Sequence, residues 1–362
     1  MVYRAIGLMS GSSLDGLDIA YVEFLHSGGK WSYEIVEAEC MPYSAEWVER
    51  LKNATHLNAL EYQLLHTEYG HFLGHCVNQF IEKNQLHFKV ALIASHGHTT
   101  FHLPEKKMTG QLGDGAAIAA VTQLPVVSDL RALDVALGGQ GAPIVPIGEK
   151  LLFEEYSFFL NIGGIANVSY NSVPYLAFDI CAANRVLNML ANEAGKEYDA
   201  GGALARTGTI VTALLQELDG LDYYRQTFPK SLANSFGVQI VYPLLKKYDE
   251  PITNLLRTYT EHIACKIGDA LKSLQTTPAP SQLLVTGGGA LNRFLIERIQ
   301  EVVEDQNIDV IVPDEKLVQY KEAMIMALIG VLRWREEYNV ISTVTGAQRN
   351  SVGGALWLGV EQ

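Results

Sequence analysis

The chain has 362 residues, of which 48% are hydrophobic, and a formal net charge of −13 at pH 7. This length exceeds one ordinary hydrophobic core, so the sequence predicts a globular protein with two lobes. The acidic balance excludes a general nucleic-acid binder, because binding to phosphate backbones requires a basic surface. It does not exclude the binding of a single nucleotide.

The cysteines and the apolar runs indicate the compartment. The four cysteines are far apart and form no CxxC pair, which suits free thiols in a reducing compartment. The chain runs from Met1 directly into a predicted strand, without the pattern of a secretion signal. Its longest apolar run, Ala323 to Leu332, is too short to span a bilayer. We therefore expect a cytoplasmic protein without a membrane segment.

A glycine- and serine-rich turn near the N-terminus is the first candidate site. Apolar residues at Ile6 and Leu8 precede the turn and the apolar pattern resumes at Leu17, which predicts strand, turn, strand. Exposed amide groups in such a turn can bind phosphate, and the neighbouring Asp15 and Asp18 can hold a cation. An ordinary hairpin with a Gly/Ser turn is the alternative.

The rest of the first half alternates predicted strands and helices. Val90 to Ala94 reads as a buried strand that ends in the polar loop Ser95 to Thr99, where α/β folds place their sites. Asp114 is expected to cap the following helix. The flexible tract Gly138 to Pro143 is the candidate hinge between lobes. It predicts an N-terminal lobe of residues 1–140 and a C-terminal lobe of residues 141–362, with a last helix that can return to the first lobe.

The second half opens with the same layout as the first. Phe158 to Tyr170 reads as two strands around Gly163 and Gly164. A strand from Tyr175 is predicted to end at Asp179. Asp179 is then either a site acid or the N-cap of the helix that begins near Asn184.

Two further features follow towards the C-terminus. A glycine triplet, Gly287 to Gly289, separates a predicted strand from a helix. Glu322 is expected in the first turn of a helix from Lys321 to Tyr338, where its charge would also complement the helix dipole. No GxxxxGK[ST] sequence occurs, which excludes a P-loop protein.

Taken together, these motifs resemble one family. The layout resembles the sugar kinase, heat-shock chaperone and actin superfamily, and more specifically the anhydro-N-acetylmuramic acid kinases. The resemblance spans almost the whole chain and is carried by GLMSGSSLDGLD from Gly7, SHGHT from Ser95, QLGD from Gln111, DLRALDVALGGQGAP from Asp129, NIGGIAN from Asn161, Phe178-Asp179, Pro229-Lys230-Ser231, GGGALN from Gly287 and Lys321-Glu322-Ala323.

The chain departs from the family pattern in three places. Asp179 to Asn184 reads DICAAN where the family usually has DTGPGN, and His98 replaces a glutamine. After Ser231 the chain has LANS where the family usually has TGRE. These differences bear on backbone contacts with phosphate and on sugar specificity.

The resemblance implies an α/β, two-lobe actin-like ATPase fold (ribonuclease H-like) with ATP in the cleft between the lobes. It implies hydrolytic opening of 1,6-anhydro-N-acetylmuramic acid and phosphorylation of O6, a step of peptidoglycan recycling. Asp179 matches the family's catalytic base. Arg131 is expected to pair with the substrate carboxylate or with developing charge, or else to bridge the lobes, and Glu322 to bind a sugar hydroxyl or water.

The resemblance also implies ATP and Mg²⁺ as cofactors, with Asp15 or Asp18 near the metal, and a homodimer. The alternatives are a kinase of another amino sugar and a non-catalytic actin-like ATP-binding protein. The residues expected to bind the nucleotide are Gly11, Ser12, Ser13, Leu14, Asp15, Gly16, Asp18, Gly163, Gly164, Gly287, Gly288 and Gly289.

Overall fold

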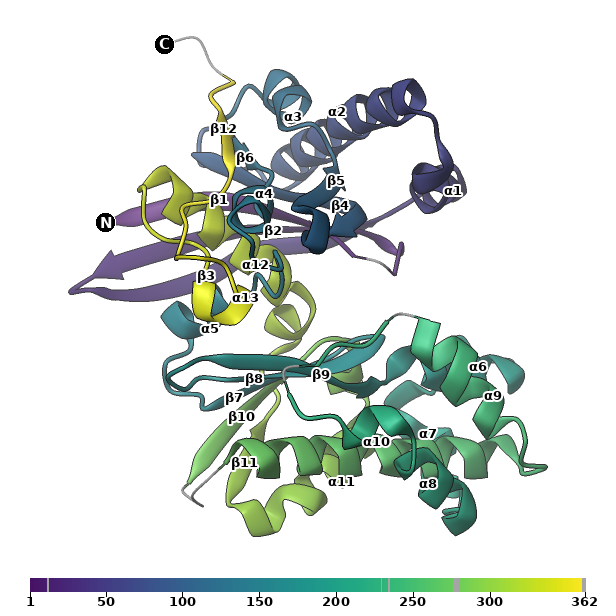
Figure 1. Ribbon diagram of the computed structural model, residues 1–362. Helices are drawn as coiled ribbons and strands as arrows, with labels where there is room; N and C mark the ends of the chain where they lie inside the picture. Colours follow the sequence, from purple (N-terminus) through teal and green to yellow (C-terminus); the bar gives the residue numbers. More distant parts are fainter. Residues whose placement is uncertain (12, 229, 234, 276–279, 360–362) are drawn as a thin grey trace. The chain divides into compact units, whose positions relative to one another are not determined.

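Two β-sheets form the framework of the computed structural model, and five strands of the larger sheet repeat the order of the smaller one (Figure 1). The structure describes residues 1–359 except Ser12, Pro229, Asn234 and 276–279. The chain divides into two compact units, which we describe separately. Unit 1 comprises Met1–Phe153 and Tyr320–Gln362, and unit 2 comprises Glu154–Gln319.

In unit 1 the strand order is β12-β6-β4-β1-β2-β3, and β5 pairs with the far end of β4. Strands β1, β2 and β3 form an antiparallel meander, and β4 and β6 follow in parallel with β1. The strands are β1 (Val2–Ser10), β2 (Gly16–Ser27), β3 (Lys30–Pro42), β4 (Leu92–Leu103), β5 (Met108–Leu112), β6 (Val126–Ser128) and β12 (Ala355–Trp357).

In unit 2 the order is β11-β10-β7-β8-β9. Again three antiparallel strands, β7, β8 and β9, are followed by two parallel ones, β10 and β11. The repeat confirms the predicted α/β class with two lobes that each open on a glycine-turn hairpin. The strands are β7 (Phe158–Ile162), β8 (Ile165–Tyr170), β9 (Leu176–Ala182), β10 (Ser281–Thr286) and β11 (Ile308–Ile311).

Helices cover the sheets, and local signals determine several of their ends. Asn58 and Glu61 form a reciprocal capping box at the start of α2. Asp114 caps α3 through the amide of Ala116, as predicted. The helices are α1 (Ala45–Asn53), α2 (Ala59–Lys83), α3 (Gly115–Thr122), α4 (Ala132–Ala136), α5 (Pro146–Leu152), α6 (Asn184–Glu193), α7 (Ala203–Thr207), α8 (Thr212–Asp219), α9 (Tyr242–Leu245), α10 (Ile252–Leu274), α11 (Arg293–Val303), α12 (Glu315–Trp334) and α13 (Ser342–Thr345).

The two units meet after Phe153 and again after Gln319, and not after residue 140 as predicted. Residues 141–153 belong to unit 1, where the amide of Gly141 donates to Asp134 and Glu149 pairs with Lys321. The tract proposed as a hinge is anchored inside the same unit, since the amide of Gln140 donates to the carbonyl of Thr345. The C-terminal residues belong to unit 1 because β12 pairs with β6.

Helix α12 packs closely on the sheet of unit 1. A Cβ atom at Gly7 of β1 would collide with the backbone of Ala323, and one at Gly330 would overlap the side chain of Ala94 on β4. Glycine at these two positions therefore lets the helix and the sheet approach each other. The contact holds this part of α12, which includes Glu322, against β1.

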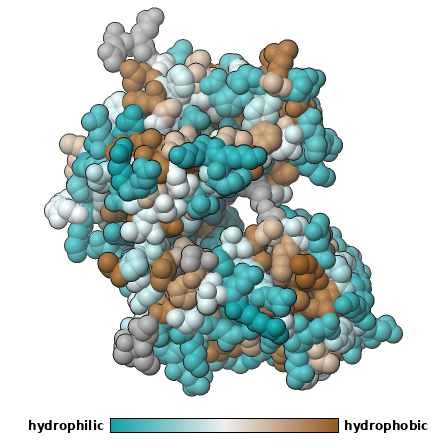
Figure 2. All heavy atoms as spheres, viewed as in Figure 1, coloured by the Kyte–Doolittle hydropathy of each residue, from teal (hydrophilic) through white to brown (hydrophobic). Residues whose placement is uncertain are grey.

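Hydrophilic residues cover much of the face shown in Figure 2, with smaller groups of hydrophobic residues between them. No helix in the described ranges is long and apolar enough to cross a membrane.

Candidate active site

The turn between β1 and β2 carries the first group of predicted residues. Ser13 donates a hydrogen bond of 2.5 Å to the carboxylate of Asp15, and the amide of Leu14 donates to the carbonyl of Gly11. Leu14 has a φ of 59°, a backbone conformation that residues other than glycine rarely adopt. Ser12 lies outside the described residues. The described residues of the turn thus include two short polar side chains, those of Ser13 and Asp15, which bond to each other.

Asp18 follows on β2, directly opposite Cys40 on β3. Burial raises the pKa of Asp18 to about 6, and the nearby charges of Asp15 and Glu322 also favour its protonated form. A hydrogen bond from the Cys40 thiol opposes this shift. The pKa of Asp18 therefore lies close to neutral pH, and two further carboxyl groups are near it.

Arg131 precedes α4 and is held by two acceptors. Its Nε donates to Nε2 of His96 over 2.8 Å, and its Nη1 donates to the carbonyl of Gly141. Burial, and then the charge of Arg131, lower the pKa of His96 to about 3, so the imidazole is neutral and accepts the hydrogen bond. Burial lowers the pKa of Arg131 to about 10, which leaves the guanidinium charged at neutral pH. Arg131 is thus a fixed cation.

Glu322 lies in the interior of α12, because that helix begins at Glu315. The predicted position in the first helical turn, with its dipole role, is therefore wrong. Burial raises the pKa of Glu322, while Lys321 and Arg131 lower it. Glu322 also acts on the charge of Asp18. The structure of unit 1 thus brings Asp18, Arg131 and Glu322 into one electrostatic cluster.

Asp179 lies within β9 of unit 2. The prediction that the strand ends at Asp179 is therefore wrong. Its Oδ2 accepts a hydrogen bond of 2.8 Å from the amide of Leu232, and its own amide donates to the carbonyl of Lys230. Burial raises the pKa of Asp179, and the hydrogen bond from Leu232 opposes the shift. Ala183 occupies the N-cap position of α6 and receives no side-chain cap, so the capping alternative for Asp179 is wrong.

The two glycine segments of unit 2 lie side by side. Thr286, which precedes the triplet, pairs with Asn161, which precedes the β7–β8 turn. A Cβ at Gly289 would overlap the side chain of Ile162, which shows how closely the segments approach. The amide of Asn184 donates to the carbonyl of Gly163 and so ties the start of α6 to the same turn. Gly163, Gly164 and Gly287–Gly289 therefore form one backbone surface.

Most glycines in the described part of the chain have an internal reason to be glycine. Either φ is positive, or a Cβ would come closer than 3.4 Å to a neighbouring atom. Four glycines meet neither condition, since a Cβ would lie at least 3.4 Å from its neighbours. All four belong to the segments that the sequence predicts to bind the nucleotide, and at these positions the protein's own packing leaves room for a side chain. They are Gly11, Gly163, Gly164 and Gly288.

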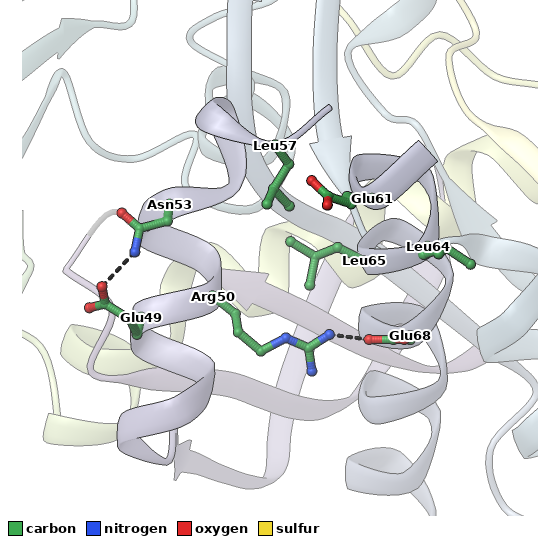
Figure 3. Close-up of a pocket in the computed structure, with 8 residues that line it drawn as sticks. All are labelled: Glu49, Arg50, Asn53, Leu57, Glu61, Leu64, Leu65 and Glu68. Atoms are coloured by element: carbon green, nitrogen blue, oxygen red, sulfur yellow. Dashed lines mark hydrogen bonds and ion pairs between the residues drawn. The ribbon is translucent and has the colours of Figure 1, made fainter. Parts of the chain in front are cut away.

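Two hollows lie outside these groups. One, of about 410 Å³, lies between α1 and α2, where Figure 3 shows Arg50 reaching towards Glu68. No predicted site residue lines it. The other, of about 240 Å³, is lined by Phe178 and Ile180, the neighbours of Asp179. Because successive side chains of a strand point to opposite faces, Phe178 and Asp179 face different sides of the sheet.

Sequence reasoning missed several partners of the predicted residues. His96 lay in a motif, but its role as the acceptor for Arg131 was not foreseen. The thiol of Cys40 and the amide of Leu232 also left no local signal, because their carboxylate partners are distant in sequence. Among the described residues, no group of three or more His, Cys, Asp or Glu side chains is arranged to hold a metal ion by itself.

Comparison with known proteins decides the family. The family model for anhydro-N-acetylmuramic acid kinase matches residues 3–359. The chain belongs to this family. Its relatives include the anhydro-N-acetylmuramic acid kinases of Francisella tularensis subsp. novicida, 32% identical over 377 residues, and of Vibrio parahaemolyticus, 32% identical over 370 residues. In both cases 97% of this chain and 97% of the relative are covered.

Among solved structures, the chain is similar to the activator of the 2-hydroxyisocaproyl-CoA dehydratase from Clostridium difficile with bound ADPNP. The TM-score is 0.47 at 14% identity, over 92% of this chain and 96% of that chain. Membership of the anhydro-N-acetylmuramic acid kinase family confirms the resemblance on which the predicted function was based.

Proposed function

We propose that this protein uses ATP to open and phosphorylate 1,6-anhydro-N-acetylmuramic acid. Water adds to the anomeric carbon, the bond from this carbon to O6 breaks, and O6 takes the γ-phosphoryl group. The products are N-acetylmuramic acid 6-phosphate, ADP and a proton. Family membership over residues 3–359 carries the proposal, together with the glycines that the fold itself does not require.

Asp179 is the proposed base that takes the proton of the water. A general base must be ionised at the working pH and be within hydrogen-bond reach of its proton. The amide of Leu232 stabilises the ionised form and fixes one carboxylate oxygen, while partial burial keeps the group basic. General-base catalysis of this kind typically contributes about 10²–10⁴-fold to the rate.

Arg131 and Glu322 are proposed to bind and orient the sugar. The bonds to His96 and Gly141 hold the guanidinium in one orientation, which suits it to pair with a carboxylate or with developing phosphoryl charge. Glu322, when ionised, accepts a hydrogen bond from a sugar hydroxyl or from water. The charge of Arg131 favours that ionised form.

The glycine segments are proposed to receive the nucleotide. Backbone amides next to glycine can approach phosphate and ribose closely because no side chain intervenes. The turn of residues 11–16 suits the phosphates, and the triplet from Gly287 suits the adenosine. Mg²⁺, which usually binds through one or two carboxylates together with phosphate oxygens, would neutralise phosphate charge here and fits Asp15 or Asp18. The crowding of Asp18 by Asp15 and Glu322 is the kind of charge that a cation relieves.

A homodimer in the cytoplasm completes the proposal. The family resemblance supports the dimer. The free cysteines, Cys40, Cys76, Cys181 and Cys265, support a reducing compartment.

A substrate panel tests this function against its nearest rival, a kinase of an ordinary amino sugar. Purified protein is incubated with ATP, Mg²⁺ and either 1,6-anhydro-N-acetylmuramic acid, N-acetylmuramic acid or N-acetylglucosamine, and ADP release is measured. We expect release with the anhydro sugar and little with the other two. Release with an ordinary amino sugar and not with the anhydro sugar would refute the proposal.

A further inference from the structure

A buried ion pair joins α12 to α5 inside unit 1. Nζ of Lys321 lies 2.9 Å from Oε1 of Glu149, and both side chains are only 4% exposed. The two residues are 172 positions apart in the chain. Burying two charges carries a large desolvation cost, and removing one partner leaves the other charge uncompensated.

The neighbouring contacts hold this part of α12 in place. Ile325 lies one helical turn after Lys321, and a Cβ at Gly148 would overlap its side chain, so α5 packs directly on the helix. Ala323 faces Gly7 of β1 at equally close range. Glu322 is thus carried by a helical turn that is fixed by α5 and by the sheet.

The charged and titratable groups coupled to Glu322 come from four parts of the chain. Lys321 on α12 and Arg131 before α4 favour its ionised form. Glu149 on α5 opposes ionisation, since it is a like charge. On β2, the charge of Glu322 favours the protonated form of the Asp18 carboxyl. Lys321 thus forms the ion pair with Glu149 and also acts electrostatically on Glu322.

We propose that the Glu149–Lys321 ion pair is a positioning device for the active site, which anchors the turn of α12 that carries Glu322 to α5 and so fixes the position of that carboxylate and of the cation next to it in the chain. The proposal rests on the role given to Glu322 in the proposed function. Lys321 and Glu149 are positioning residues, because they act through Glu322 and not on the substrate.

Direct titration of Glu322 provides the first test. The protein is labelled with ¹³C at the glutamate side-chain carboxyl, and the Glu322 signal is identified by its loss in Glu322→Gln. In Lys321→Met we expect the carboxyl to titrate at higher pH than in wild type, and in Glu149→Gln at lower pH. The double variant should fall between the two single variants, because it removes both charges.

Steady-state kinetics on the same proteins provides the second test. Lys321→Met should lower kcat for the anhydro sugar by up to about 10²-fold, the loss that a small misplacement can cause, with little change in KM for ATP. Lys321→Arg keeps the cation and should recover most of the turnover. The control is Lys246→Met, which breaks the more exposed pair with Glu193 in unit 2 and should change neither readout.

The outcomes distinguish a failure of the positioning role from a failure of the proposed function on which it rests. Identical titration of Glu322 in all variants overturns the positioning role, whatever their activity. If Glu322 titrates as expected but Glu322→Gln keeps wild-type turnover, the role of Glu322 in the proposed function fails, and the link between the ion pair and catalysis fails with it. If Lys321→Met does not fold, the shift to lower pH is sought in Glu149→Gln, where no shift overturns the proposal.

Discussion

The backbone amide of Leu232 donates a hydrogen bond of 2.8 Å to Oδ2 of Asp179. This bond holds the proposed base from a segment that lies 53 residues further along the chain. It also separates a chemical role of Asp179 from a structural one, because asparagine keeps an oxygen that can accept the same bond.

Asp179→Asn should therefore fold normally and lose turnover. Since the amide cannot take a proton, we expect kcat to fall by about 10²–10⁴-fold. The melting temperature and the affinity for ATP should hardly change. Turnover, thermal denaturation and calorimetric ATP titration are measured on one preparation, with Asp309→Asn, an exposed site on β11 of the same unit, as control. Near-normal turnover would leave Asp179 a structural residue.

Asp18→Asn should be more stable than wild type at neutral pH. Because the pKa of Asp18 is raised in the folded state, from 3.8 to about 6, the native protein binds this proton more tightly than the unfolded chain does. Its contribution to stability is complete below pH 3.8 and is lost as the pH rises through about 6. At 1.36 kcal/mol per pKa unit, the cost at pH 7 is at most about 3 kcal/mol.

Thermal denaturation of both proteins between pH 3.5 and pH 8 measures this effect. The variant should gain in melting temperature relative to wild type above about pH 6 and show no gain near pH 3.5. A constant difference across the range would contradict the assigned environment of Asp18. Kinase activity should fall in the variant, since the carboxylate of Asp18 contributes to the active site and not to the stability of the fold.

Alanine at the unconstrained glycines should weaken nucleotide binding without harming the fold. In Gly11→Ala and Gly163→Ala the new Cβ lies at least 3.4 Å from its neighbours, so the melting temperature should hold. The new Cβ would occupy space proposed to receive ATP. We therefore expect calorimetry to show about a tenfold loss of affinity for ATP, or about 1.4 kcal/mol. Gly289→Ala is the matched contrast, since its Cβ overlaps Ile162 and should lower the melting temperature. Unchanged ATP affinity in both of the first variants would remove these turns from the nucleotide site.

Elements with strong local signals were predictable. The alternating apolar residues around Gly11 and around Gly163 indicated the two hairpins that the structure shows as β1–β2 and β7–β8. Asp114 caps α3, as its position before the predicted helix indicated. Apolar periodicity and turn residues are short-range features, so one sequence carries them in full.

Features that depend on distant partners were not predictable. The polar stretch from Ser95 to Thr99 looks like a loop, yet it continues β4 because β1 and β5 supply pairing on either side. Asp179 likewise lies within β9 and not at its end, since β8 pairs with β9 beyond it. The pair of Lys321 with Glu149 left no pattern in the sequence because only the packing of α5 on α12 brings the two together.

The central claim is that ring opening and phosphorylation occur in one reaction, and the mass of the product tests it most directly. The protein is incubated with ATP, Mg²⁺ and 1,6-anhydro-N-acetylmuramic acid, and the sugar is analysed by mass spectrometry beside a control without enzyme. We predict a single product that has gained one water and one phosphoryl group. A product that has gained the phosphoryl group alone, with the anhydro ring intact, would contradict the account.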